Sequence, residues 1–165
     1  MDVDGPTRRE RADRLKERIY LTFAALAVVL ALSTHEVETG EALRTLIVTV
    51  LATLLAVFTA DVISHIVVHE RVMTLTELRH ALSASFGAIG AVTLPVVFLA
   101  IAAAGGWSTE AALRASAVAL LLSLVIIGWI AVRRIAIRWW QRVIVMGAEA
   151  VLGLAVIGLQ VLAHG

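Results

Sequence analysis

Five stretches of mostly apolar residues, four of them roughly 20 residues long, constrain this chain more than any other feature. A helix of about 20 residues crosses the roughly 30 Å hydrocarbon layer of a bilayer. Hydrophobic residues make up 60% of the chain and charged residues 16%, whereas a soluble domain has about half and about a quarter. The sequence therefore predicts an all-α integral membrane protein, a bundle of five transmembrane helices. Their expected bounds are about 19–34, 45–68, 81–104, 111–132 and 143–163.

The polar segment 1–18 is expected to be a cytoplasmic tail, followed by a transmembrane domain over 19–165. The tail is rich in acidic residues and lacks a small-x-small cleavage site, so we expect it to be retained as a signal anchor. Segments 1–18, 69–80 and 133–142 hold twelve of the fourteen basic residues, while the opposite side has Arg44 and Arg114. The positive-inside rule then places the N-terminus in the cytoplasm and the C-terminus outside. This pattern predicts a multi-pass protein of the inner (plasma) membrane, and the excess of Arg over Lys suggests a bacterial source.

Composition and motifs argue against several functions. The net charge is +1, which gives no electrostatic case for nucleic acid, and the chain contains no Cys for disulfides or thiolate metal sites. The sequence shows no Gly-x-Ser-x-Gly, no His-Glu-x-x-His and no other paired motif with a nucleophile. We therefore expect neither an enzyme nor a bound cofactor.

The ends of the apolar stretches carry residues typical of a membrane interface. Between the third and fourth stretches, "GGWSTE" supplies glycines that stop a helix, Trp107 for the interface, and Ser108 or Thr109 as a helix cap. Pro95 lies inside the third stretch and is expected to kink that helix. A basic, aromatic segment before the last stretch is expected to anchor the protein and to contact membrane lipids. Its residues are Arg133, Arg134, Arg138, Trp139, Trp140 and Arg142.

Ionisable residues inside two apolar stretches form the candidate site. Asp61, His65 and His69 follow at four-residue spacing and share one helix face near the cytoplasmic end. Glu149 in the last stretch lies at a matched depth, roughly 10 Å from the same end. Carboxylate and imidazole ligands suit divalent iron, manganese or zinc, so Asp61, His65 and Glu149 form a candidate metal site, with Ser64 and His69 as additional candidates. We expect this face to adjoin a small-residue stripe that points into the bundle: Ala52, Ala56, Ala60 and Ser64.

The same residues also have a structural interpretation. Asp61 can bridge two helices, and Glu149 can be protonated or hydrogen-bonded to a serine, because a buried carboxylate is costly unless it is paired. His69 is next to Glu70 and Arg71 and can be an ordinary solvated residue. Two functions follow: a small transporter of a divalent cation, or a non-transporting membrane scaffold or accessory subunit of another membrane complex.

Three features resemble the VIT/CCC1 family of vacuolar iron and manganese transporters. The layout of five spans is similar, and "TADVIS", residues 59–64, resembles the family's Gly-Glu-Tyr-Val-Ser, with Asp61 at the glutamate and Ser64 at the serine. The stretch "ALSASFGAIGAVTLPVV" is similar to the family's small-residue helix that ends in proline, and the sequence from "GWIAVRR" to "VIG" is similar to its basic loop and glycine-rich last helix. The resemblance implies transport of iron or manganese as substrate, a metal-site role for Asp61, and a homodimer.

Overall fold

The computed structural model describes residues 8–133 and, beyond them, residues 140, 143–144, 147, 151, 154–155, 158 and 162. Within 8–133, the chain is helical apart from short connections. The elements are α1 (Arg8–Ser33), α2 (Thr39–His69), α3 (Leu75–Ala88), the 3-10 helix η1 (Ile89–Ala91), α4 (Thr93–Ala103) and α5 (Thr109–Arg133). The expected all-helical fold is confirmed for this part of the chain.

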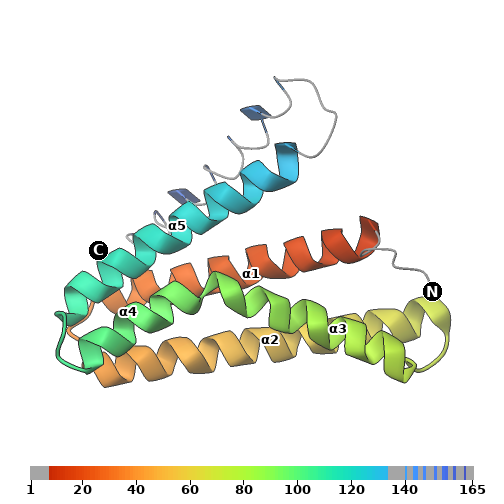
Figure 1. Cartoon of the computed structure of the whole chain (residues 1–165), viewed down its shortest axis with the longest axis horizontal. Helices are drawn as coiled ribbons and strands as arrows, with labels where there is room; N and C mark the ends of the chain where they lie inside the picture. Colours follow the sequence, from red (N-terminus) through yellow and green to blue (C-terminus); the bar gives the residue numbers. More distant parts are fainter. Residues whose placement is uncertain are drawn as a thin grey trace.

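Helix α1 occupies the centre of the bundle. It lies between α5 on one side and α2 and α3 on the other (Figure 1). Its buried residues recur every three or four positions and so form one stripe along the helix. These residues are Leu21, Thr22, Ala25, Leu26 and Val29. The Thr22 hydroxyl donates to the Arg18 carbonyl oxygen at 2.7 Å, so this buried polar group is satisfied within its own helix.

The other helices pack their own stripes against α1 and against one another. Helix α2 contributes Ala42, Leu46 and Val50, which are one turn apart. Helix α5 contributes a similar stripe at four-residue spacing, in which the Ser116 hydroxyl donates to the Ala112 carbonyl oxygen at 2.7 Å. The buried members of the α5 stripe are Ala112, Ser116, Leu120 and Leu124, with Leu113 beside them. The core is therefore largely apolar helix-on-helix packing, in which the Thr22 and Ser116 hydroxyls are hydrogen-bonded within their own helices.

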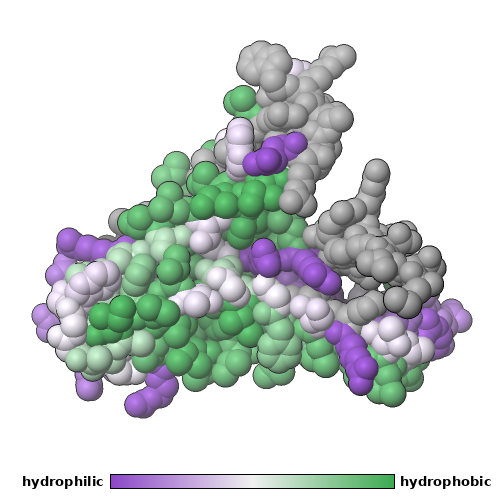
Figure 2. Space-filling view, viewed as in Figure 1, coloured by the Kyte–Doolittle hydropathy of each residue, from purple (hydrophilic) through white to green (hydrophobic). Residues whose placement is uncertain are grey.

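Two helices are long and apolar enough to cross a membrane alone, namely α2 and the 109–131 part of α5. The pair formed by α3 with η1 and α4 also qualifies if it is one bent span, which makes three spans in the part of the chain that the structure describes. Helix α1 is continuous with the expected tail, and its last 18 residues include Lys16, Glu17 and Arg18. Hydrophobic surface covers much of the visible face, and hydrophilic groups gather mainly toward the ends of the helices (Figure 2). These observations agree with a helical membrane protein, while the count of five and the orientation stay predictions.

The bend in the third apolar stretch lies one turn before Pro95. The axes of α3 and α4 differ by 52°, and η1 joins them. Pro95 has no N–H to donate to the Ala91 carbonyl, and its ring would clash with that carbonyl in a continuous helix. The chain therefore breaks at residues 89–92, and Pro95 is buried in the first turn of α4, where its missing N–H costs nothing.

The predicted turn between the third and fourth stretches is confirmed. Gly105 has φ of 83°, a left-handed conformation that glycine adopts without strain. A Cβ at Gly106 would lie 2.8 Å from the Ile101 side chain, so glycine is also required there for steric reasons. The Ser108 hydroxyl accepts a hydrogen bond from the Ala111 N–H at 3.2 Å and so caps α5. Trp107 packs on Phe98, with ring centroids 5.6 Å apart.

Candidate functional site

Asp61 and His65 lie on the side of α2 that faces the bundle. Both are half-buried, whereas His69 and Ser64 are exposed. The half-buried positions of this part of α2 recur every three or four residues and form one face. They are Thr53, Leu54, Val57, Phe58, Asp61, Val62 and His65. The bundle-facing side of α2 is thus mostly apolar and becomes polar toward its C-terminal end, at Asp61 and His65.

The small-residue stripe of α2 points the other way, so the expectation that it faces the bundle is wrong. Ala52, Ala56, Ala60 and Ser64 are all exposed. The larger residues Leu54, Val57 and Phe58 fill the space toward the bundle instead. The reason is physical: lipid chains are as apolar as a protein interior, so the pattern of small residues alone does not decide which face is covered.

Asp61 contacts a basic residue of α1. The Lys16 ammonium nitrogen lies 3.8 Å from Asp61 Oδ1, and the side chains are 43% and 28% exposed. This ion pair joins the polar part of α1 to the polar end of α2. The proposed partner Glu149 lies outside the described residues, so its distance from Asp61 stays untested.

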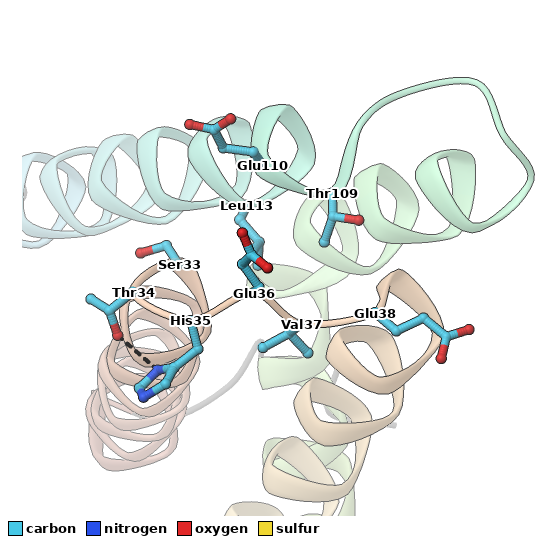
Figure 3. A pocket seen from close by; sticks show the side chains of 9 residues that line it. All are labelled: Ser33, Thr34, His35, Glu36, Val37, Glu38, Thr109, Glu110 and Leu113. Carbon is cyan, nitrogen blue, oxygen red and sulfur yellow. Dashed lines mark hydrogen bonds between the residues drawn. The ribbon is translucent and has the colours of Figure 1, made fainter.

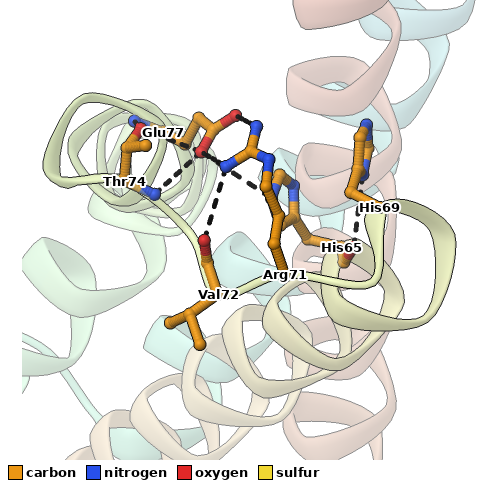
Figure 4. A network of polar contacts seen from close by, with 6 residues as sticks. All are labelled: His65, His69, Arg71, Val72, Thr74 and Glu77. Carbon is orange, nitrogen blue, oxygen red and sulfur yellow. Dashed lines mark hydrogen bonds and ion pairs between the residues drawn. The ribbon is translucent and has the colours of Figure 1, made fainter.

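His65 contacts α3 and its own helix (Figure 4). Its Nε2 atom lies 3.7 Å from Glu77 Oε2, and the imidazole is 11% exposed. The His65 and His69 rings stack with centroids 4.3 Å apart. His69 Nδ1 lies 3.2 Å from the His65 carbonyl oxygen. Both imidazoles are therefore held in place at the corner where α2 meets α3.

Glu77 is the residue that organises this corner, and the spacing analysis did not identify it. Arg71 donates two hydrogen bonds to its carboxylate, at 2.9 Å to Oε2 and 2.6 Å to Oε1. The Thr74 N–H donates to Oε2 at 2.8 Å while the Thr74 hydroxyl accepts from the Glu77 N–H, which forms a capping box. The motif Thr-x-x-Glu was the available signal, since it marks a helix start.

Glu77 and Arg71 each favour the charged form of the other side chain. Hydrogen bonds from Arg71 and Thr74 hold the pKa of the Glu77 carboxyl well below its usual range. The hydrogen bond to Glu77 in turn raises the pKa of the Arg71 guanidinium. Both groups precede Ala81, where the apolar part of this span begins. The corner therefore carries a fixed ion pair at neutral pH.

Within the described part of the chain, no three His, Asp or Glu residues lie close enough together to hold a metal ion. Asp61 and His65 each face a different partner, Lys16 and Glu77. A metal site at this place would therefore need Glu149 and a change in these pairings. The candidate site stays a prediction as far as Glu149 is concerned.

A shallow pocket of about 590 Å³ lies at the opposite end of the bundle (Figure 3). It is formed by the α1–α2 connection and the start of α5, which are joined by a hydrogen bond between the Thr39 and Thr109 hydroxyls. Its charged residues Glu36, Glu38 and Glu110 are all exposed. Glu110 accepts a hydrogen bond from Arg114 at 2.5 Å. The pocket lining is Ser33, Thr34, His35, Glu36, Val37, Glu38, Thr109, Glu110 and Leu113.

The predicted lipid anchor is described only at its edges. Arg133 is exposed in the last turn of α5, where a cation favours the negative end of the helix dipole. Trp140 is 45% exposed, in keeping with an interfacial aromatic residue. Arg134, Arg138, Trp139 and Arg142 lie outside the described residues.

The fold and the polar corner together define a small helical protein with membrane-spanning helices. Comparisons of the chain with models of protein families, with curated proteins and with solved structures find no match. The resemblance to VIT/CCC1 transporters therefore rests on the sequence motifs alone.

Proposed function

We propose that the protein is a non-transporting membrane subunit whose ionisable residues hold its helices together. The observation that carries this proposal is that the two bundle-facing ionisable residues of α2 each contact an opposite or complementary group on a neighbouring helix. Asp61 contacts Lys16 of α1, and His65 contacts Glu77 of α3. A carboxylate near lipid needs a partner, and here Lys16 provides one without a bound cation.

We also propose that the protein associates with a second copy of itself through the exposed surface of α2. Between residues 47 and 68 the exposed side of this helix carries no charge, and it presents Ala52, Ala56, Ala60 and Ser64 along one line. Small residues let two helix backbones approach closely in lipid, where packing drives association. A line of this kind is self-complementary, as the symmetric contact of two identical helices requires.

Cation transport is the second candidate, and one observation favours it. The broken span formed by α3 and α4 packs against α2, which carries Asp61 and His65. Discontinuous helices beside ionisable residues are typical of transport sites. In this alternative, Lys16 would occupy the place of the cation at Asp61 and would move away when iron or manganese binds.

The experiment that separates the two is divalent-metal uptake into proteoliposomes. The non-transport proposal predicts Mn²⁺ and Fe²⁺ uptake equal to that of protein-free vesicles, for the wild type and for Asp61→Asn. Glu110→Gln serves as the matched control, because it removes an exposed carboxylate at the other end of the bundle. Uptake by the wild type and by Glu110→Gln that is lost in Asp61→Asn would overturn the proposal and support transport.

A further inference from the structure

The two halves of the bent span differ in how firmly they are held. Helix α4 is buried along its length through Pro95, Leu99 and Ala102. Helix α3 is buried only toward its C-terminal end, at Ser85 and Ala88, whereas Leu75 in its first turn is 79% exposed. The structure thus buries α4 more deeply than the N-terminal part of α3, although α3 also packs against α1 and α2.

The junction between the halves is built to bend. Residues 89–91 form a 3-10 turn, and the hydrogen bond that Pro95 would donate to Ala91 is missing. A Cβ at Gly90 would meet no atom within 4 Å, so the surroundings do not clamp this residue. Arg18 of α1 donates a hydrogen bond to the Gly87 carbonyl at 3.3 Å, which holds α3 close to the junction rather than at its far end.

Among the described residues, Glu77 makes the polar contacts that join the far end of α3 to α2 and to the loop after it. Glu77 reaches across to the loop that follows α2, where it accepts two hydrogen bonds from Arg71, and to His65 on α2 itself. The capping box with Thr74 lies at the start of α3 and would move with the helix. The Glu77 contacts to Arg71 and His65 therefore tie the free end of α3 to its neighbour.

We propose that α3 is a pivoting arm that turns about residues 89–92 and is latched onto α2 by Glu77. An arm of 14 residues is roughly 21 Å long, so a rotation of about 10° moves its free end by roughly 4 Å. That displacement breaks hydrogen bonds of 2.6–2.9 Å. Opening the latch uncovers the half-buried face of α2 around Asp61 and His65, whether or not the protein transports a cation.

Distances between pairs of spin labels in bilayer nanodiscs test the arm. The chain has no Cys, so introduced cysteines are the sole attachment sites. One pair, Thr76→Cys with Thr59→Cys, joins α3 to α2, and the other, Val97→Cys with Val118→Cys, joins α4 to α5; all four positions are exposed. Glu77→Gln should lengthen the α3–α2 distance by roughly 4 Å or broaden its distribution to that extent. It should leave the α4–α5 distance unchanged.

Two further variants make the test specific. Glutamine still completes a capping box, so Glu77→Gln removes the ion pair with Arg71 without removing the helix start. Glu110→Gln, at the other end of the bundle, should change neither distance. Gly90→Ala reduces the backbone freedom of the junction and should narrow the distribution of the Glu77→Gln protein. Wild-type distances in Glu77→Gln, equal changes in both pairs, or no effect of Gly90→Ala would overturn the proposal.

Discussion

Lys16 of α1 and Asp61 of α2 form an ion pair with a separation of 3.8 Å between Nζ and Oδ1. The two residues are 45 positions apart in the chain, and their pair joins the first two helices. The pair fixes the depth at which the polar part of α1 lies beside α2. It also explains how a carboxylate is accommodated toward the end of a strongly apolar helix.

A double-mutant cycle on this pair should show a favourable coupling. Lys16→Gln and Asp61→Asn are each expected to lower the free energy of unfolding, and together by less than the sum of the two. Because both side chains are partly exposed, the coupling should be about 0.5 kcal/mol. The measurement is unfolding of the four proteins by SDS in mixed micelles. Fully additive effects would show that the two residues do not interact.

Glu77 should make the stability of the protein depend on pH in the acidic range. Its pKa in the folded protein is lower than the value of about 4.3 for an unperturbed glutamate, so folding favours its ionised form. The stabilisation is fully present above that value and is lost as the pH falls toward the pKa of the folded state. At pH 7, Glu77→Gln should lower the Tm by roughly 1–3 °C.

The matching measurement is thermal unfolding in detergent from pH 7 to pH 2. The difference in Tm between the wild type and Glu77→Gln should shrink as the solution becomes more acidic. Glu110→Gln, which removes an exposed partner of Arg114, is the control for a general effect of losing a carboxylate. A difference that is constant across the range would contradict the role given to Glu77.

Leucines on the two sides of the bundle should respond differently to truncation. Leu26 is fully buried at the centre of α1, whereas Leu55 on α2 is 67% exposed. Leu26→Ala should cost about 2–4 kcal/mol, because it leaves a cavity among packed helices. Leu55→Ala should change the free energy of unfolding by less than about 1 kcal/mol, because detergent or lipid fills the space. Equal losses would mean that the surface of α2 at Leu55 is covered by protein.

Association through α2 should depend on the size of its small residues. Ala56→Leu places a bulky side chain on the outward line and should weaken pairing of two copies roughly tenfold, equivalent to about 1.4 kcal/mol. The control Ala100→Leu makes the same change at an exposed position of α4. Energy transfer between differently labelled copies in liposomes measures the pairing. Equal effects of the two variants would exclude α2 as the contact. So would energy transfer that occurs with an unrelated labelled membrane protein but not between two copies of this chain.

Much of the fold follows from local patterns in the sequence. The expected helix 111–132 agrees closely with α5, and the glycines before Ser108 end α4 as predicted. Helix α2 begins at Thr39, six residues earlier than expected, because residues 39–44, which include Thr39, Glu41 and Arg44, continue the helix beyond its strongly apolar part. Helix α3 begins at Leu75, where the Thr74 and Glu77 capping box starts it. Apolarity alone therefore marks the core of a membrane helix but not its polar end turns.

The partners of the candidate site could not be predicted in the same way. The spacing of Asp61 and His65 identified their common face correctly, because helical periodicity is local. Their contacts with Lys16 and Glu77 depend on how three helices are placed around one another, which no local pattern encodes. The expectation that the small-residue stripe of α2 faces the bundle was wrong for a related reason. The direction in which the stripe points depends on which helices pack against α2.

The central place of α1 has a consequence for how the protein is made. This helix is synthesised before α2 to α5, and Lys16, Glu17 and Arg18 lie where its polar part meets its apolar part. Each of these charges disfavours insertion of the isolated segment into a membrane. Asp61 of α2, which pairs with Lys16, is synthesised later, as are the surfaces of α5 that cover Leu26 and its neighbours. Stable insertion of α1 is thus expected to depend on α2 and α5, which are made after it and pack against it.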